Sequence, residues 1–470
     1  MTSPAELSLC DAAERIRSRE LSSREVTAAC VERIERHAGD LNCFIRFDPD
    51  EALARADAAD RALAAGTEAG PLHGVPLAHK DMFYRAGVVC TCGSKIRRDF
   101  VPDRTATVLA RLDAAGALDI GALNLSEFAH GPTGHNAHFG ACRNPWNLAH
   151  ISGGSSSGSG SSVAARLVFG ALGSDTGGSV RLPAAANGLV GIKPTQTRVS
   201  RHAMMGLSFS LDNAGPLTRT VRDAARLLGV IAGHDQEDAT SSPLPVPDYE
   251  AATLAPDIRG LRVGVPRNYY HDTVATEVKS LLDGSLRELE GLGAEVVEVT
   301  VPHHEHIAHL QHIVQTSEAA TLHADWLAGR AGDYGPQVRA RILPGLATPV
   351  TWYLRALQLR PRIVADFVEQ VFGACDVLHL PAMAIPVPTI EETDVGASRE
   401  FTRIIAGIVR CTLPISFLTC PSIVMPCGFT ANGLPCSFQL AGRPFDEATL
   451  FRAAAAYEEA TGFSSLAPAL

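Results

Sequence analysis

Two glycine- and serine-rich turns hold residue types that could cleave an amide. Residues 174–183 read SDTGGSVRLP, and residues 152–162 read SGGSSSGSGSS. In the later turn, Gly177 and Gly178 let backbone N–H groups converge beside the hydroxyl of Ser179, which makes an anion-binding nest next to a nucleophile. Amide hydrolysis needs this pair, because a tetrahedral oxyanion must be stabilised after a hydroxyl attacks the carbonyl carbon.

A lysine supplies the candidate base. Lys80 lies in the segment GVPLAHKD at 74–81, and it is one of only four lysines among 41 basic residues. At the end of a buried apolar run, desolvation would lower the pKa of this lysine and leave a neutral amine that can accept a proton. Arginine cannot release its proton in this way. A lysine at this place, in a chain that otherwise uses arginine, therefore indicates a base.

Other hydrolase patterns fit the sequence less well. The nucleophile-elbow pattern G-x-S-x-G fails at 158–162, because residue 162 is serine, and no histidine follows an obvious Ser-His-Asp order. The tract 152–162 also has the composition of a flexible linker. It runs directly into the apolar segment 163–170, however, so we interpret it as one wall of a site that the turn 174–183 completes.

Alternating strand and helix patterns must position these turns. Apolar runs at 75–78 and 117–123 predict strands on either side of a helix at 105–114. A second strand, helix and strand are predicted within 261–301. This alternation is typical of an α/β fold.

The 470 residues are predicted to form a single domain, 1–470. The core with the catalytic turns is expected at 65–235, and the segment 235–257, rich in Asp, Ser and Pro, is expected to be a surface linker. Residues 258–470 would then form a second βαβ-like layer and the C-terminal part of the domain.

Composition sets limits on the expected partners. The 51 acidic and 41 basic residues give a net charge of -10, which argues against nucleic acid or an anionic membrane as a partner. The start MTSPAELSLC lacks the pattern of a signal peptide, and no apolar run is long enough to span a bilayer. We therefore expect a cytoplasmic protein that acts on a small molecule with water, and we leave a homodimer open. Eleven scattered cysteines fit reduced thiols better than a disulfide framework.

A histidine-rich run at 303–312 invites a metal interpretation, because helical spacing would align three of its histidines. The run does not match H-E-x-x-H, since Ala308 occupies the position of the second histidine counted from His304. We predict a partly exposed helix here, with no metal and no cofactor.

Together these stretches resemble the amidase-signature family. The match runs from GGSS at 153–156 to DTGGSVR at 175–181, with the family's step of 24 residues between Ser155 and Ser179. Further similar motifs, such as GVPLAHKDMF at 74–83, extend the resemblance over nearly the whole chain. The resemblance implies a large mixed central β-sheet covered by helices on both faces.

The resemblance also implies roles for individual residues. Lys80 would be the terminal base, Ser155 would relay the proton after an unusual cis peptide bond, and Ser179 would be the acylated nucleophile. The other implied roles are an oxyanion hole from the backbone of Thr176, Gly177, Gly178 and Ser179, substrate binding by Phe128, Ala129, His130, Gly131 and Ser156, and bracing of the turn by Asp175 and Arg181.

The predicted activity is that of a serine-dependent amidohydrolase acting through an acyl-enzyme, with esters, anilides and carbamates as further candidate substrates. The alternative is the A subunit of a glutamine-dependent tRNA amidotransferase, because NLSEFAHG at 124–131 and NPWN at 144–147 resemble that branch. Against it, His130 stands where that branch usually has methionine, and 395–420 lacks its aspartate-proline and tyrosine-rich pattern. We therefore favour a free-standing hydrolase of a neutral, partly hydrophobic amide.

Overall fold

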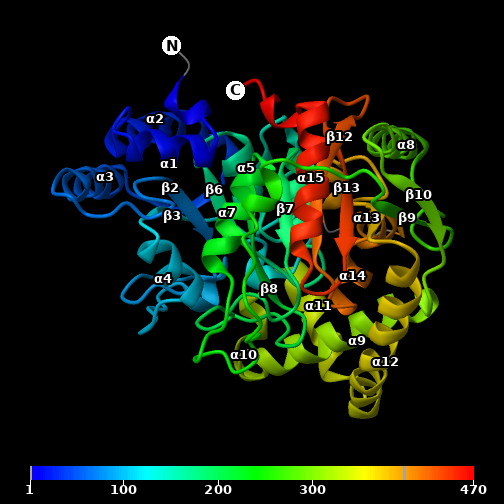
Figure 1. Ribbon diagram of the computed structural model, residues 1–470. Coiled ribbons are helices and arrows are strands. Elements are labelled where there is room, and N and C mark those ends of the chain that lie inside the picture. Colours follow the sequence, from blue (N-terminus) through cyan, green and yellow to red (C-terminus); the bar gives the residue numbers. More distant parts are fainter. Residues whose placement is uncertain (1–2, 395–398) are drawn as a thin grey trace.

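A mixed sheet of eleven strands forms the centre of the computed structural model, which describes residues 3–394 and 399–470 (Figure 1). Residues 395–398, which begin the segment 395–420, lie outside the described residues. In spatial order the strands are β1 (Phe44–Phe47), β3 (Leu118–Leu123), β2 (Pro76–Lys80), β6 (Gly170–Asp175), β8 (Asn213–Thr218), β7 (Val190–Lys193), β12 (Ser422–Phe429), β13 (Pro435–Gly442), β11 (Val377–Pro381), β9 (Arg262–Pro266) and β10 (Glu295–Val299). The short strands β4 (Arg143–Asn144) and β5 (Asn147–Ile151) form a separate antiparallel pair.

Helices cover this sheet, and α7 and α15 are seen in front of it in Figure 1. Within 3–394 and 399–470, none of the helices is long and apolar enough to cross a membrane. The helices are α1 (Leu9–Arg17), α2 (Ser23–Leu41), α3 (Pro49–Ala64), α4 (Thr107–Ala114), α5 (Ser157–Ala164), α6 (Arg181–Asn187), α7 (Val221–Ile231), α8 (Thr276–Gly291), α9 (His304–Leu322), α10 (Ala324–Arg330), α11 (Pro336–Leu346), α12 (Val350–Ala374), α13 (Arg399–Val409), α14 (Leu413–Phe417) and α15 (Glu447–Thr461).

The pairing of β2 with β6 places the predicted base beside the later turn. The two strands are parallel neighbours, with Ala78 opposite Ala171 and His79 opposite Leu172. Parallel neighbours end at the same edge of a sheet, where ligand sites of α/β proteins form. Lys80 ends β2 and Asp175 ends β6, so the lysine and the turn 174–183 meet there.

The predicted α/β fold with a mixed sheet is confirmed. The sheet contains parallel pairs, such as β2 with β3, and antiparallel pairs, such as β6 with β8. The unit predicted within 261–301 is β9, α8 and β10, whose two strands are parallel. Strands from before and after 235–257 belong to this one sheet.

The tract 152–162 is a buried part of the site and not a flexible linker. Its second half begins α5, every residue of which is buried. The hydroxyl of Ser159 donates to the carbonyl of Leu172 in β6 at 3.0 Å. A Cβ at Gly158 would lie 2.6 Å from the backbone nitrogen of Asn124, so the backbone of α5 packs against the loop after β3. Small residues are required here because larger ones would separate α5 from the sheet.

We expect Gly158→Ala to lower the free energy of unfolding by about 1–3 kcal/mol, because the added methyl group overpacks this contact. Urea unfolding followed by circular dichroism measures the change. Gly229→Ala is the matched control, because Gly229 lies on α7 and a Cβ placed on it would have nothing within 4 Å. This control should leave the protein as stable or add up to about 1 kcal/mol. Equal destabilisation by both variants would contradict the packing described for α5.

Candidate active site

The amine of Lys80 is buried between two hydroxyl groups. Its Nζ donates to the Oγ of Ser155 at 2.7 Å and to the Oγ of Ser174 at 2.9 Å. Burial lowers the pKa of Lys80 to about 7, although the charges of Asp212 and Asp175 oppose that shift. Among the described residues, no carboxylate forms an ion pair with this amine. A large fraction of Lys80 is therefore neutral near pH 7 and can accept a proton.

Ser155 lies at the centre of the arrangement and is fully buried. It follows a cis peptide bond from Gly154, as the resemblance implies. Its carbonyl accepts a hydrogen bond from the backbone N–H of Ser126 at 3.1 Å, which ties it to the loop after β3. Its hydroxyl accepts the hydrogen bond from Lys80.

Ser179 offers a more accessible hydroxyl than Ser155, since it is only partly buried. The backbone N–H of Ser156 donates to the carbonyl of Ser179 at 3.3 Å and joins the two turns directly. Within the part of the chain that the structure describes, the Ser179 hydroxyl makes no hydrogen bond. A nucleophilic hydroxyl must be accessible to the substrate and not held by another hydrogen bond.

The conformation of this turn depends on Gly178, whose φ is +134°. A side chain would be strained at that angle, and its Cβ would lie 2.8 Å from the Cβ of Thr412. The Thr412 hydroxyl instead donates to the carbonyl of Gly177 at 2.7 Å. Glycine is therefore required here for both conformation and space.

Asp175 and Arg181 brace the turn with a fully buried ion pair. The Nε and Nη2 of Arg181 each donate to a carboxylate oxygen of Asp175 at 3.0 Å. Burial alone would raise the pKa of Asp175, but the Arg181 guanidinium beside it holds that pKa below its usual value. Arg181 also donates to the hydroxyl of Ser416 on α14 at 2.8 Å. The pair thus fixes the turn to a distant part of the chain.

Of the four N–H groups predicted to bind an oxyanion, one already donates a hydrogen bond within the protein. The N–H of Gly178 donates to the carboxylate of Asp175 at 2.8 Å. The N–H groups of Thr176, Gly177 and Ser179 have no acceptor among the described residues. These three remain able to donate to an oxyanion.

The predicted substrate-binding stretch lies against the Ser155 turn. A Cβ at Gly154 would collide with the carbonyl oxygen of Gly131, so the two backbones touch. His130 is buried, and its Nε2 has no hydrogen-bond partner. Ala129 has a positive φ of 61°, which helps turn this stretch towards the site.

Phe128 is buried in an aromatic cluster at the far side of this stretch. Its ring stacks on Trp326 at a centroid distance of 5.4 Å and meets His323 edge-on at 4.6 Å. Ser156 lies elsewhere, since its hydroxyl donates to the carbonyl of Ser174 and accepts from the N–H of that residue, both at 3.3 Å. Ser156 therefore bonds to β6 and does not face the Phe128 stretch.

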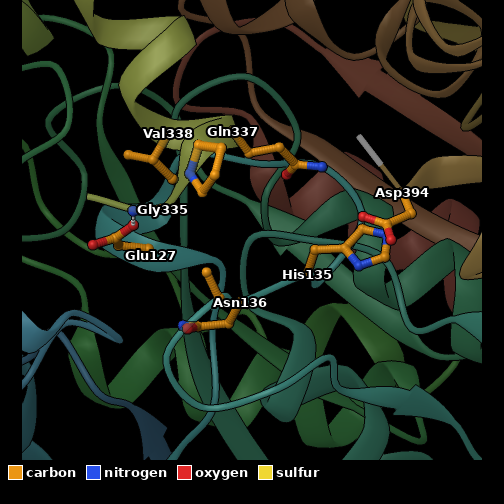
Figure 2. A pocket seen from close by; sticks show the side chains of 9 residues that line it. Glu127, His135, Asn136, Gly335, Gln337, Val338 and Asp394 are labelled. Carbon is orange, nitrogen blue, oxygen red and sulfur yellow. Dashed lines mark hydrogen bonds between the residues drawn. The ribbon is translucent and has the colours of Figure 1, made fainter. Parts of the chain in front are cut away.

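A cavity of about 220 Å³ opens next to these residues. Gln337 and Val338 of α11 lie on one side of it, and His135 and Asp394 lie on the other (Figure 2). The side-chain oxygen of Gln337 comes within 3.8 Å of a Cβ placed on Gly131. The cavity thus borders the predicted substrate-binding stretch.

Sequence reasoning missed several polar residues near the turns. Ser174 binds the base directly, and its place before Asp175 was the available signal. Gln311 and Gln315 of α9 each lie 3.5 Å from a Cβ placed on Gly177, and the histidine-rich run that contains Gln311 gave no sign of this contact.

The histidine-rich run lies at the start of α9, and its first histidine contacts α12. The Nε2 of His303 lies 2.7 Å from a carboxylate oxygen of Asp366. Across residues 3–394 and 399–470, no group of three His, Cys, Asp or Glu side chains is arranged to hold a metal.

The chain is similar in sequence to proteins of one family. Residues 25–451 match the family model for Amidase. The A subunit of the glutamyl-tRNA(Gln) amidotransferase from Geobacter metallireducens is 39% identical, over 97% of this chain and 98% of its own. Its counterpart from Moorella thermoacetica is 40% identical over 96% of each chain.

Solved structures agree with this result. The chain of a vestigial protein complex linked to the origins of an s-triazine catabolic enzyme has a TM-score of 0.89 and 33% identity, over 97% of this chain and 99% of that one. A bacterial aryl acylamidase of the amidase signature family has a TM-score of 0.88 and 27% identity, over 98% and 99%. The A subunit of the Thermotoga maritima glutamyl-tRNA(Gln) amidotransferase has a TM-score of 0.81 and 29% identity, over 98% and 96%.

These relatives correct the prediction about partners. We predicted a small-molecule amide and water as the only partners besides a second copy, with nucleic acid excluded. The relatives are one subunit of an enzyme named for its action on a tRNA, which contradicts that exclusion. The exclusion of nucleic acid, which we based on a net charge of -10, was wrong because one subunit of an enzyme need not itself supply the basic surface that binds nucleic acid.

The sequence match spans most of the chain, and the similar folds cover nearly all of it. The resemblance predicted from the two turns is therefore confirmed. The chain belongs to the amidase family, the family of the amidase-signature enzymes.

Proposed function

We propose that the chain hydrolyses a carboxylic amide through an acyl-enzyme on Ser179. The observation that carries the proposal is the 2.7 Å hydrogen bond between Lys80 and Ser155, made by an amine whose pKa burial lowers to about 7. A buried neutral amine next to a serine hydroxyl can activate a nucleophile without histidine.

The proposed reaction has five steps. The Ser179 hydroxyl attacks the carbonyl carbon, and its proton passes through Ser155 to Lys80. The N–H groups of Thr176, Gly177 and Ser179 stabilise the oxyanion. The proton then returns to the leaving nitrogen, the C–N bond breaks, and an acyl ester remains on Ser179. Water attacks this ester by the same route and releases a carboxylic acid.

The role that the comparisons favour is that of a glutamine-hydrolysing A subunit, which supplies ammonia to an amidotransferase. Support comes from curated relatives of this name at 37–42% identity over at least 96% of this chain. Large exposed apolar side chains also lie at the end of α11 and the start of α12, as expected of a surface that contacts another protein. These side chains are Leu343, Leu346, Val350, Trp352 and Leu354.

A free-standing amidase is the second candidate. Phe128, in the stretch predicted to bind substrate, packs in an aromatic cluster, and apolar surroundings of this kind suit a partly apolar acyl group. Among the similar structures are an aryl acylamidase and a peptide amidase, the latter with a TM-score of 0.84.

We expect a fluorophosphonate to label Ser179, because it is the accessible hydroxyl beside the oxyanion donors. Peptide mass mapping should place the adduct within residues 174–183, and Ser179→Ala should abolish it. An adduct on Ser155 would reverse the assignment of nucleophile and relay.

Replacing Lys80 by arginine should lower the acylation rate on the order of 10³-fold, close to the loss in Lys80→Ala, because arginine cannot take up a proton. Single-turnover kinetics on an activated amide measure this rate. Lys95→Arg is the matched control, since Lys95 forms a surface ion pair with Asp333 at 3.0 Å. If Lys80→Arg kept most of the activity that Lys80→Ala lost, the lysine would serve as a cation and not as a base.

An amidotransferase A subunit would work in a complex with other subunits, whereas a free-standing amidase would work alone. In the amidotransferase role, the chain purified from its native cell should elute in a complex, and its release of ammonia from glutamine should increase when charged tRNA is added. Size-exclusion chromatography and an ammonia assay test this expectation. A chain that elutes alone, with amidase activity unaffected by tRNA, would favour the free-standing enzyme.

A further inference from the structure

A second cavity, of about 320 Å³, opens beside β1 and shares no lining residue with the cavity next to α11. Its walls come from β1, from the residue that follows β2 and from the loop at 89–98. The lining residues that decide its chemistry are Ile45, Arg46, Asp81, Val89, Arg98 and Phe139. Small-molecule sites have volumes of roughly 300–1,000 Å³, so this cavity is large enough to hold a small ligand.

Asp81 places a carboxyl group in this cavity, although only 2% of the residue is exposed. Its Oδ2 accepts hydrogen bonds from the backbone N–H and the hydroxyl of Thr91. No donor within residues 3–394 and 399–470 reaches its other oxygen, Oδ1. Burial raises the pKa of Asp81, while the hydrogen bonds from Thr91 and the charge of Arg46 act against that shift. A buried carboxyl oxygen without a donor would be satisfied by a cationic donor on a ligand.

Arg46 supplies a positive charge to the same cavity. It is half-buried on β1, and its Nε is enclosed by protein without a hydrogen-bond partner. In the part of the chain that the structure describes, its guanidinium donates no hydrogen bond and forms no ion pair. By contrast, the half-buried Arg111 donates to the carbonyls of Ile231 and Ala232, both at 2.8 Å. Arg46 is therefore a partly desolvated charge that an anionic group would stabilise.

The two opposite charges line one cavity without meeting. Among the ion pairs of the described residues, none joins Arg46 to Asp81. A molecule that fills the space between them meets an acid on one side and a guanidinium on the other. An ammonium group suits the acid, and a carboxylate suits the guanidinium, which can hold it by two parallel hydrogen bonds. The exposed Arg98 adds a second positive charge to the lining, and Ile45, Val89 and Phe139 add apolar surface.

A hydrogen bond separates this cavity from the one that borders the predicted substrate-binding stretch. His138 lines the cavity beside β1, and its Nε2 lies 2.9 Å from the Oε1 of Glu127. Glu127 lines the other cavity (Figure 2), and its Oε2 accepts from the N–H of Gly335 at 2.8 Å, directly before α11. The cavity beside β1 is thus a separate space, one contact away from the substrate side.

We propose that the cavity beside β1 is a second ligand site, which binds a free α-amino acid with a small aliphatic side chain. The ammonium group of the ligand donates to the Oδ1 of Asp81, and its carboxylate binds the guanidinium of Arg46. The aliphatic side chain lies against the apolar residues of the lining. This site is distinct from Ser179 and does not depend on the amide hydrolysis proposed above.

The test compares three probes that share one aliphatic chain and differ in their charged groups. L-leucine carries both charges, 4-methylpentanoate lacks the ammonium group, and 3-methylbutylamine lacks the carboxylate. Isothermal titration calorimetry on the full chain should show that leucine binds, and that each of the other two binds roughly 10-fold more weakly or worse. Each of them gives up the hydrogen bonds to one charged group.

Two variants assign each end of the ligand to its residue. Arg46→Gln should weaken leucine and 4-methylpentanoate roughly 10-fold and leave 3-methylbutylamine unchanged, because only the partner of the carboxylate is lost. Asp81→Asn keeps an acceptor for Thr91 but removes the charge, so it should weaken leucine and 3-methylbutylamine and leave 4-methylpentanoate unchanged. Circular dichroism checks that both variants are folded, and Arg46→Gln alone decides the proposal if Asp81→Asn is not.

Arg104→Gln is the matched control, because Arg104 is an exposed arginine that pairs with its neighbour Asp103 at 3.2 Å. It removes the same charge as Arg46→Gln and should bind all three probes as the wild type does. Ser179→Ala should also bind leucine with unchanged affinity, since the proposed site lies outside the nucleophile turn. Absence of leucine binding to the wild-type chain, equal binding of the three probes, or unchanged leucine binding in Arg46→Gln would overturn the proposal.

Discussion

The desolvation of one amine determines the chemistry of this site. Lys80 is surrounded by protein and donates to the hydroxyls of Ser155 and Ser174, neither of which is charged. A directly paired carboxylate would favour the protonated amine and raise its pKa. The two nearby acids are engaged elsewhere: Asp175 pairs with Arg181, and Asp212 accepts hydrogen bonds from the backbone of Leu207 and Ser208. The ion pair that braces the turn thereby also leaves Lys80 without a direct counter-charge.

The rest of the fold brings three distant segments to this amine. The parallel pairing of β2 and β6 brings the base and the nucleophile turn to one edge of the sheet. Helix α5 packs against β6 through glycine and serine, which holds the Ser155 turn in the gap between them. Hydrogen bonds from Arg181 then tie the nucleophile turn to α14, near the other end of the chain. Small residues are essential where α5 packs on the sheet, because the contacts there are between backbones or short side chains.

The sequence predicted the parts of the structure that depend on local patterns. The apolar runs at 75–78 and 117–123 became β2 and β3, and the two turns were recognised because glycine and serine occur there at a fixed spacing. Contacts between distant segments could not be predicted in this way. Gln311 and Gln315 lie on α9, whose sequence does not mark them as site residues, and only the packing of α9 brings them near Gly177. The net charge gave a wrong prediction about nucleic acid because it describes the surface of one chain, and the relatives are subunits of a larger enzyme.

The most direct measurement is the titration of Lys80 itself. The chain contains only four lysines, so labelling with lysine enriched in ¹³C at Cε gives a simple NMR spectrum, in which Lys80→Arg identifies the signal of interest. We expect a midpoint near pH 7 for this signal, because burial lowers the pKa of Lys80 to about 7. A lysine that stays protonated up to its ordinary pKa of about 10.4 would be a permanent cation, and the base assigned here would be wrong.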